Sequence, residues 1–65
     1  MANDIEIFLE YIRKTEKAIL MSDGDNEEWL PLSQISIEYD LDEIEEHDEV
    51  LVILPEWLAN DKGFI

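Results

Sequence analysis

Apolar residues alternate with polar ones through residues 4–14, which read D-I-E-I-F-L-E-Y-I-R-K. This period of two is typical of a half-buried strand, and the β-branched and aromatic content favours a strand as well. Phe8 and Ile12 then lie on the face opposite the main apolar series, where they would suit a homodimer contact. The same segment also fits the i, i+3, i+4, i+7 spacing of a helix, so an N-terminal helix is the alternative.

A hairpin is expected next. After a polar turn at Thr15 and Glu16, residues 17–22 (K-A-I-L-M-S) predict a second strand and residues 27–30 a third. The D-G-D-N turn between them, at 23–26, supplies residues that readily adopt positive φ, as tight hairpin turns require. Pro31 cannot donate to a ladder, so the third strand ends there or lies on an edge.

The second half of the chain continues the strand pattern. Residues 31–35 predict a turn or a single 3₁₀ turn that places Leu32 and Ile35 on the core, and residues 36–39 alternate like a fourth strand. Residues 49–54 (E-V-L-V-I-L) are the most apolar segment and are expected at the centre of the sheet.

Pro55 ends that strand and begins a short helix over residues 55–63, with Gly63 at the position that follows a last helical turn. Trp57 and Leu58 are expected to seat this helix on the end of the fold. The sequence therefore predicts a mainly β protein. We expect a small, strongly bent antiparallel sheet of about five strands, closing into an SH3-like or OB-like barrel, with a short C-terminal helix. The alternative is an α+β fold with the N-terminal helix.

Length and composition narrow the class of protein. Sixty-five residues without a linker or repeat predict a single small domain, and 46% hydrophobic residues are too many for a disordered acidic tail. The absence of cysteine excludes disulfides and thiolate metal sites and fits a reducing cytosol. No apolar run approaches the ~20 residues of a membrane span, and the first residues lack the features of a signal peptide. We therefore expect a cytoplasmic protein.

Charge is the extreme property of the chain. Eighteen acidic residues against four basic ones give a net charge of −14, and eight of the twelve residues at 38–49 are carboxylates. This sign of charge disfavours direct binding to nucleic acid or to an anionic membrane and favours the basic surface of a protein partner. A solvated surface loop is the alternative. The expected partner-binding residues are Asp40, Asp42, Glu43, Glu45, Glu46, Asp48 and Glu49, with Asp23, Asp25, Glu27 and Glu28 as a second cluster.

Catalytic and metal chemistry are not expected. His47 lies among acids in an expected loop and is interpreted as a solvated histidine, and the acidic run offers little apolar cover to raise a carboxyl pKa. The segment that begins at Asp23 lacks the ligand spacing of an EF-hand, so no metal or other cofactor is predicted. Trp29 and Trp57 are expected in the core; an exposed indole would instead mark a contact surface.

Three segments resemble a family of small proteins of phages and mobile elements with the pattern K-A-x-L, W-[LI]-P-x-S-Q-I and P-x-W-x-A-x-x-K-G. They are K-A-I-L at 17–20, W-L-P-L-S-Q-I at 29–35 and P-E-W-L-A-N-D-K-G at 55–63. The chain departs from the pattern at Leu32, where the family usually has a polar residue, and in its unusually acidic loop.

The resemblance implies a phage origin and hence a place in the host cytoplasm during infection. Acidic phage proteins of this size often resemble anti-CRISPR inhibitors, some of which imitate DNA. We therefore expect a non-enzymatic inhibitor that blocks the basic DNA-binding channel of a host defence complex. The alternative is a protein-interaction module or small subunit in phage replication or recombination.

Overall fold

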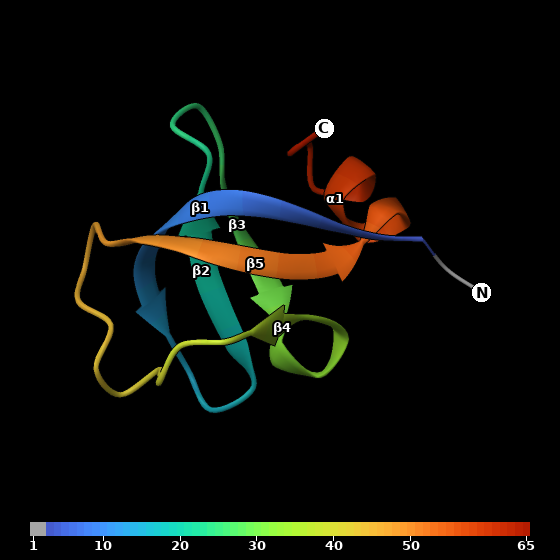
Figure 1. Ribbon diagram of the computed structural model, residues 1–65. Coiled ribbons are helices and arrows are strands. Elements are labelled where there is room, and N and C mark those ends of the chain that lie inside the picture. The colour runs from blue at the N-terminus through green and yellow to red at the C-terminus, as the bar shows by residue number, and fades with distance from the viewer. Residues whose placement is uncertain (1–2) are drawn as a thin grey trace.

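The computed structural model describes residues 3–65 as one five-stranded antiparallel sheet with a short helix after its last strand (Figure 1). A 3₁₀ turn, η1, connects the third and fourth strands. The elements are β1 (Asp4–Lys14), β2 (Ala18–Ser22), β3 (Glu27–Pro31), η1 (Leu32–Gln34), β4 (Ser36–Ile37), β5 (Glu49–Pro55) and α1 (Glu56–Asp61). The order of the strands across the sheet is β3-β2-β1-β5-β4.

The central strand is β1. The prediction that residues 49–54 form the centre of the sheet was wrong by one strand. β5 is an inner strand between β1 and β4, which explains its apolar sequence. β1 is long enough to pair with β5 through its first part and with β2 through its second. A β-bulge lies between Tyr11 and Arg13 and makes Ile12 the extra residue. Bulges bend a strand and increase its twist, so β1 curves and carries β2 and β3 around the core.

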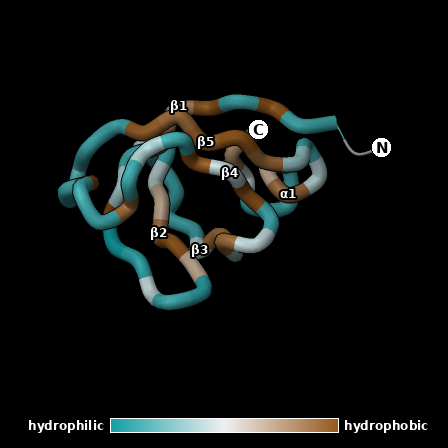
Figure 2. The backbone as a smooth tube through the Cα atoms, turned by 60° about the horizontal axis from the view of Figure 1, so that its bottom comes forward, coloured by the Kyte–Doolittle hydropathy of each residue, from teal (hydrophilic) through white to brown (hydrophobic). Residues whose placement is uncertain are grey.

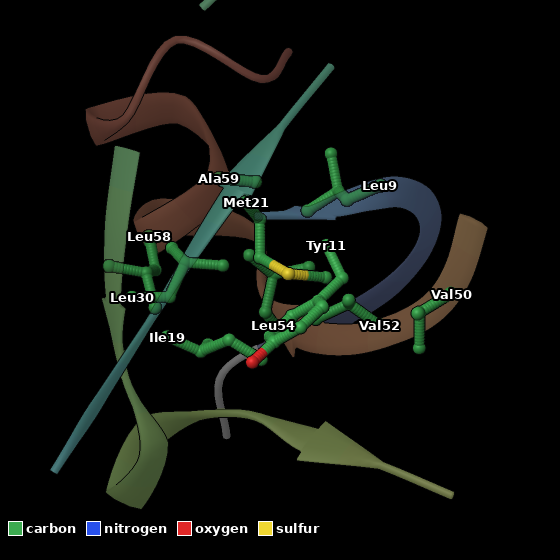
Figure 3. Close-up of a cluster of buried hydrophobic side chains, with 10 residues drawn as sticks. All are labelled: Leu9, Tyr11, Ile19, Met21, Leu30, Val50, Val52, Leu54, Leu58 and Ala59. Carbon is green, nitrogen blue, oxygen red and sulfur yellow. The ribbon is translucent and has the colours of Figure 1, made fainter. Parts of the chain in front are cut away.

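One face of the curved sheet, the inner face, forms the core together with α1 (Figure 3). The buried positions follow the period of two predicted for β1, and the same alternation holds in β5. The buried hydrophobic residues are Leu9, Tyr11, Ile19, Met21, Leu30, Val50, Val52, Leu54, Leu58 and Ala59.

The two tryptophans are exposed, which contradicts their predicted place in the core. Leu58 and Ala59 seat α1 on the sheet, whereas the Trp57 side chain is 55% exposed. Successive helical residues point about 100° apart, so a helix of six residues that buries 58 and 59 turns position 57 aside. Trp29 is 41% exposed because it alternates with the buried Leu30 along β3.

The helix ends as the sequence predicts. Gly63 has a φ of +80° and follows the last turn, where the Phe64 N–H donates to the Ala59 carbonyl at 2.8 Å and the Gly63 N–H to the Asn60 carbonyl at 3.2 Å. This pair of bonds is a Schellman motif. The Asn26 side-chain amide donates to the Gly63 carbonyl at 3.3 Å, so the β2–β3 turn is tied to the C-terminal segment.

The mainly β prediction, with about five antiparallel strands and a short C-terminal helix, is confirmed, and the alternative with an N-terminal helix is wrong. The sheet is open and does not close into the expected barrel: over residues 3–65, no ladder joins β3 to β4. β4 has two residues where four were expected, because the chain then leaves the sheet in a long polar connection (Figure 2). In residues 3–65 no helix is long and apolar enough to cross a membrane.

Candidate acidic interface

The connection between β4 and β5, residues 38–48, holds most of the predicted site and is here termed the acidic loop. Leu41 and Ile44 are half-buried and pack against the core, which anchors the middle of the loop. Two carboxylates order its backbone. Asp40 Oδ1 accepts the N–H of Asp42 at 2.9 Å, and Asp48 Oδ2 accepts the N–H of Glu45 at 3.0 Å. The acidic loop thus has an apolar underside and carboxylates that remain exposed.

The end of the acidic loop is held against β1. The His47 N–H donates to the Tyr11 carbonyl at 2.6 Å, and the Tyr11 N–H donates to the Asp48 carbonyl at 2.8 Å. His47 has a φ of +75°, a left-handed conformation that non-glycine residues seldom adopt. These bonds continue the pairing between β1 and β5 beyond its regular end at Glu10 and Glu49.

A first hollow, the loop hollow, lies beside the acidic loop and has a volume of about 290 Å³. Four of the predicted carboxylates line it, together with apolar side chains from the loop and from β5. The lining residues are Tyr39, Asp40, Glu43, Ile44, Asp48, Glu49 and Val50. Three carboxylates of the acidic loop, those of Asp40, Glu43 and Asp48, therefore surround a concave surface together with Glu49 of β5.

A row of side chains crosses the outer face of the sheet, the face opposite the core. Glu49 on β5 is paired with Glu10 on β1, Glu10 with Ser22 on β2, and Ser22 with Glu27 on β3. Residues paired directly across antiparallel strands share a face. Glu10, Glu27 and Glu49, here termed the acidic row, therefore lie on one face and connect the acidic loop to the β2–β3 hairpin.

A second hollow, the sheet hollow, adjoins the acidic row and has a volume of about 130 Å³. Glu49 lines both hollows, so the carboxylates around the loop hollow and that of Asp23 belong to one continuous surface. The residues that line the sheet hollow are Phe8, Glu10, Ser22, Asp23, Gly24 and Glu49.

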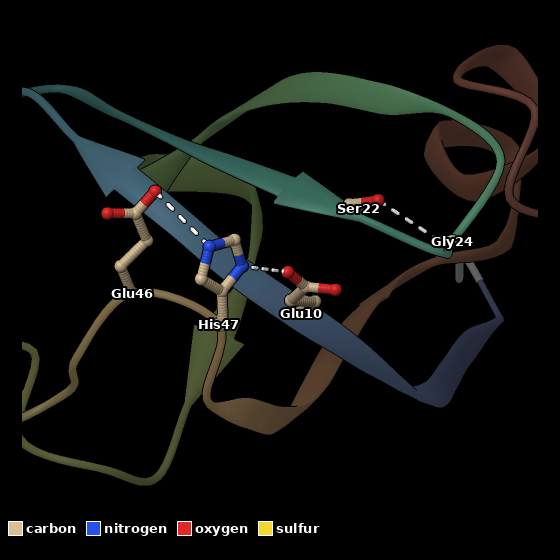
Figure 4. A network of polar contacts seen from close by, with 5 residues as sticks. All are labelled: Glu10, Ser22, Gly24, Glu46 and His47. Carbon is tan, nitrogen blue, oxygen red and sulfur yellow. Dashed lines mark hydrogen bonds and ion pairs between the residues drawn. The ribbon is translucent and has the colours of Figure 1, made fainter.

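His47 lies between two carboxylates on this surface (Figure 4). Its Nδ1 contacts Glu10 Oε2, and its Nε2 lies 3.5 Å from Glu46 Oε2. The hydrogen bond to Glu10 raises the pKa of His47 above the ordinary 6.5, against a smaller opposing effect of desolvation, and the charges of Glu10, Glu46 and Glu27 raise it further. The predicted solvated histidine is thus exposed but paired.

Asp23 organises the β2–β3 turn. Its Oδ1 accepts the N–H of Asn26 at 2.8 Å and that of Asp25 at 2.9 Å. These bonds lower the pKa of Asp23 below its ordinary 3.8, because they favour the ionised carboxylate. Asp23 therefore carries its full negative charge at neutral pH.

The structure brings together most of the predicted site, but not all of it. Asp25 lies at the exposed tip of the turn, and Glu28 points to the other side of β3 from Glu27. Asp42 pairs with Lys14 at 3.7 Å, which offsets part of its charge. Glu45 is exposed on the acidic loop but neither lines a hollow nor contacts His47. The predicted residues that share the continuous surface are Asp23, Glu27, Asp40, Glu43, Glu46, Asp48 and Glu49.

Glu10 is the central residue that the prediction missed. Its place between two apolar positions of β1 indicates the outer face, but only the pairing of β1 with β5 puts it beside Glu49. The local sequence around Glu10 contains no run of acids, so nothing near it in the chain marks it as part of an acidic surface.

Chemistry at this surface is that of carboxylates and one imidazole. The Ser22 hydroxyl oxygen accepts the Gly24 N–H at 3.0 Å, while His47 contacts Glu10 and Glu46. Within residues 3–65, no group of three His, Cys, Asp or Glu side chains has an arrangement that could hold a metal ion.

Comparison with protein-family models, with curated proteins and with solved structures gave no significant match. The resemblance to phage and mobile-element proteins therefore stays a prediction.

Glu10→Gln is expected to lower the pKa of His47 towards 6.5, because a neutral amide replaces the carboxylate that favours the imidazolium. Because the pKa of His47 is raised in the folded protein, its contact with Glu10 stabilises the fold fully below pH 6.5. This stabilisation is lost as the pH rises through the raised pKa of His47. An NMR titration of the imidazole protons measures the pKa. Glu6→Gln, an exposed change on the same strand, is the control, and an unchanged pKa in Glu10→Gln would contradict the assignment.

Proposed function

We propose that this protein is a non-enzymatic inhibitor that occupies the basic, nucleic-acid-binding surface of another protein. Its carboxylates take the places of phosphates. The observation that carries the proposal is the continuous acidic surface, on which Glu49 joins the loop hollow to the sheet hollow. The resemblance to phage proteins makes a host defence complex of the CRISPR type the expected partner.

The balance of charges supports this proposal. The chain has four basic residues, and in residues 3–65 one ion pair, between Lys14 and Asp42, joins a lysine or arginine to a carboxylate. Most carboxylates are thus free of internal cations and can attract external ones. Association with a basic surface should be fast, steered over long range and sensitive to salt.

A competition experiment tests the proposal. The immobilised protein captures partners from a bacterial lysate at low salt, and each captured protein is then tested for binding in the presence of duplex DNA. We expect duplex DNA to displace the protein and high salt to release it, because both weaken the same charge contacts. A captured partner that binds DNA and this protein at the same time would refute the mimicry.

The second candidate is a protein-interaction module, for example a subunit in phage replication or recombination. It is favoured by the exposed aromatic side chains of Phe8, Trp29 and Trp57. Apolar burial is not screened by salt, so a partner held by these residues should remain bound at high salt. The salt step in the competition experiment therefore separates the two candidates.

A further inference from the structure

The outer face of the sheet carries large apolar side chains on both sides of the acidic row. On one side Phe8, 60% exposed, is paired with the half-buried Leu51. On the other side Leu20 is paired with Trp29 on β3 and with the basic Arg13 on β1. This sheet face has no covering element among residues 3–65, since α1 packs on the inner face. Exposed apolar patches that are rimmed by polar residues are typical of contact surfaces.

The sheet hollow combines three kinds of group. Phe8 supplies an aromatic wall, and Glu10, Asp23 and Glu49 supply carboxylates from β1, the β2–β3 turn and β5. Ser22, only 8% exposed, also lines it. The volume of about 130 Å³ is several times the space that one water molecule needs. An ammonium or guanidinium group can pair with the carboxylates and stack on the ring at the same time.

The negative charge of the acidic row determines which kind of partner can cover the outer face of the sheet. A second copy would bring its own acidic row against Glu10, Glu27 and Glu49, and like charges at close range oppose such a contact. A basic polypeptide complements both the carboxylates and the apolar residues, because lysine and arginine have apolar stems.

We propose that the sheet hollow accepts a lysine or arginine side chain of the partner, while an adjacent apolar residue of that partner packs on Phe8 and Leu51. This inference rests on the proposed function and adds to it, because it requires a partner surface that is both basic and apolar. A protein that only imitated phosphates would not require the apolar part.

Two synthetic peptides test the inference by NMR titration of the ¹⁵N-labelled protein. One contains arginine and leucine, and in the other serine replaces every leucine, so their charges are equal. We expect the leucine peptide to bind about 5- to 10-fold more tightly, with the largest amide shifts at the residues of the sheet hollow. Phe8→Ala should abolish this difference, whereas Trp57→Ala, which removes a similarly exposed aromatic side chain on α1, should keep it.

Other results would overturn the inference. Equal binding of the two peptides, or shifts confined to the acidic loop, would leave the proposed function standing and remove the docking role of Phe8. No binding of either peptide would count against the sheet hollow, while the DNA competition tests the proposed function separately. A dimer detected by sedimentation and lost in Phe8→Ala would show that a second copy covers this face. Circular dichroism checks that each variant folds.

Discussion

Reversal of Glu43, Glu45 and Glu46 to lysine should slow association with a basic partner by on the order of 100-fold at low salt. All three side chains belong to the acidic loop, and Glu43 also lines the loop hollow. The loop's backbone is ordered by Asp40 and Asp48, so the reversal should leave the fold intact. Stopped-flow or surface-plasmon measurements over a salt series give the association rate, and circular dichroism confirms folding.

The matched control reverses Glu16, Glu56 and Asp61, which are exposed and lie outside the acidic loop, the acidic row and both hollows. Both variants carry the same net charge, so their comparison separates the position of the charges from their number. Glu56 and Asp61 lie at opposite ends of α1, where the effects of reversal on the helix dipole oppose each other. Equal slowing in both variants would show that net charge alone drives association, without an organised face.

Leu9→Ala should destabilise the protein by about 2–5 kcal/mol, because it leaves a cavity in the centre of the core. Leu9 is 1% exposed on the central strand. A domain of this length has a total stability of roughly 3–10 kcal/mol, so the variant loses a large part of it. Thermal unfolding followed by circular dichroism should show a midpoint lower by more than about 10 °C.

Phe8→Ala is the control, since it removes a larger side chain from the preceding position of the same strand. Phe8 faces solvent, so its removal should change the unfolding midpoint far less than Leu9→Ala. A similar loss in both variants would mean that the outer face of β1 is covered, and would contradict the exposure on which the docking proposal depends.

The strands were predictable because their signal is local. The period of two in β1, the Asp-Gly turn after β2 and the glycine that ends α1 each depend on a few neighbouring residues. The exposure of Trp57 was not predictable in this way. The apolar surface of a tryptophan favours a place in the core, and only the docking of Leu58 and Ala59 turns Trp57 outward.

The sequence by itself determined the strand pattern, the net charge of −14 and the concentration of acids at 38–49, since all three are properties of composition and near neighbours. Only the tertiary structure decided that β1 is the central strand and that Glu10 and Glu49 stand side by side with Asp23 near them. These residues are far apart in the chain. Their approach depends on the register between strands and on the bulge at Ile12, which arise from packing of the whole sheet.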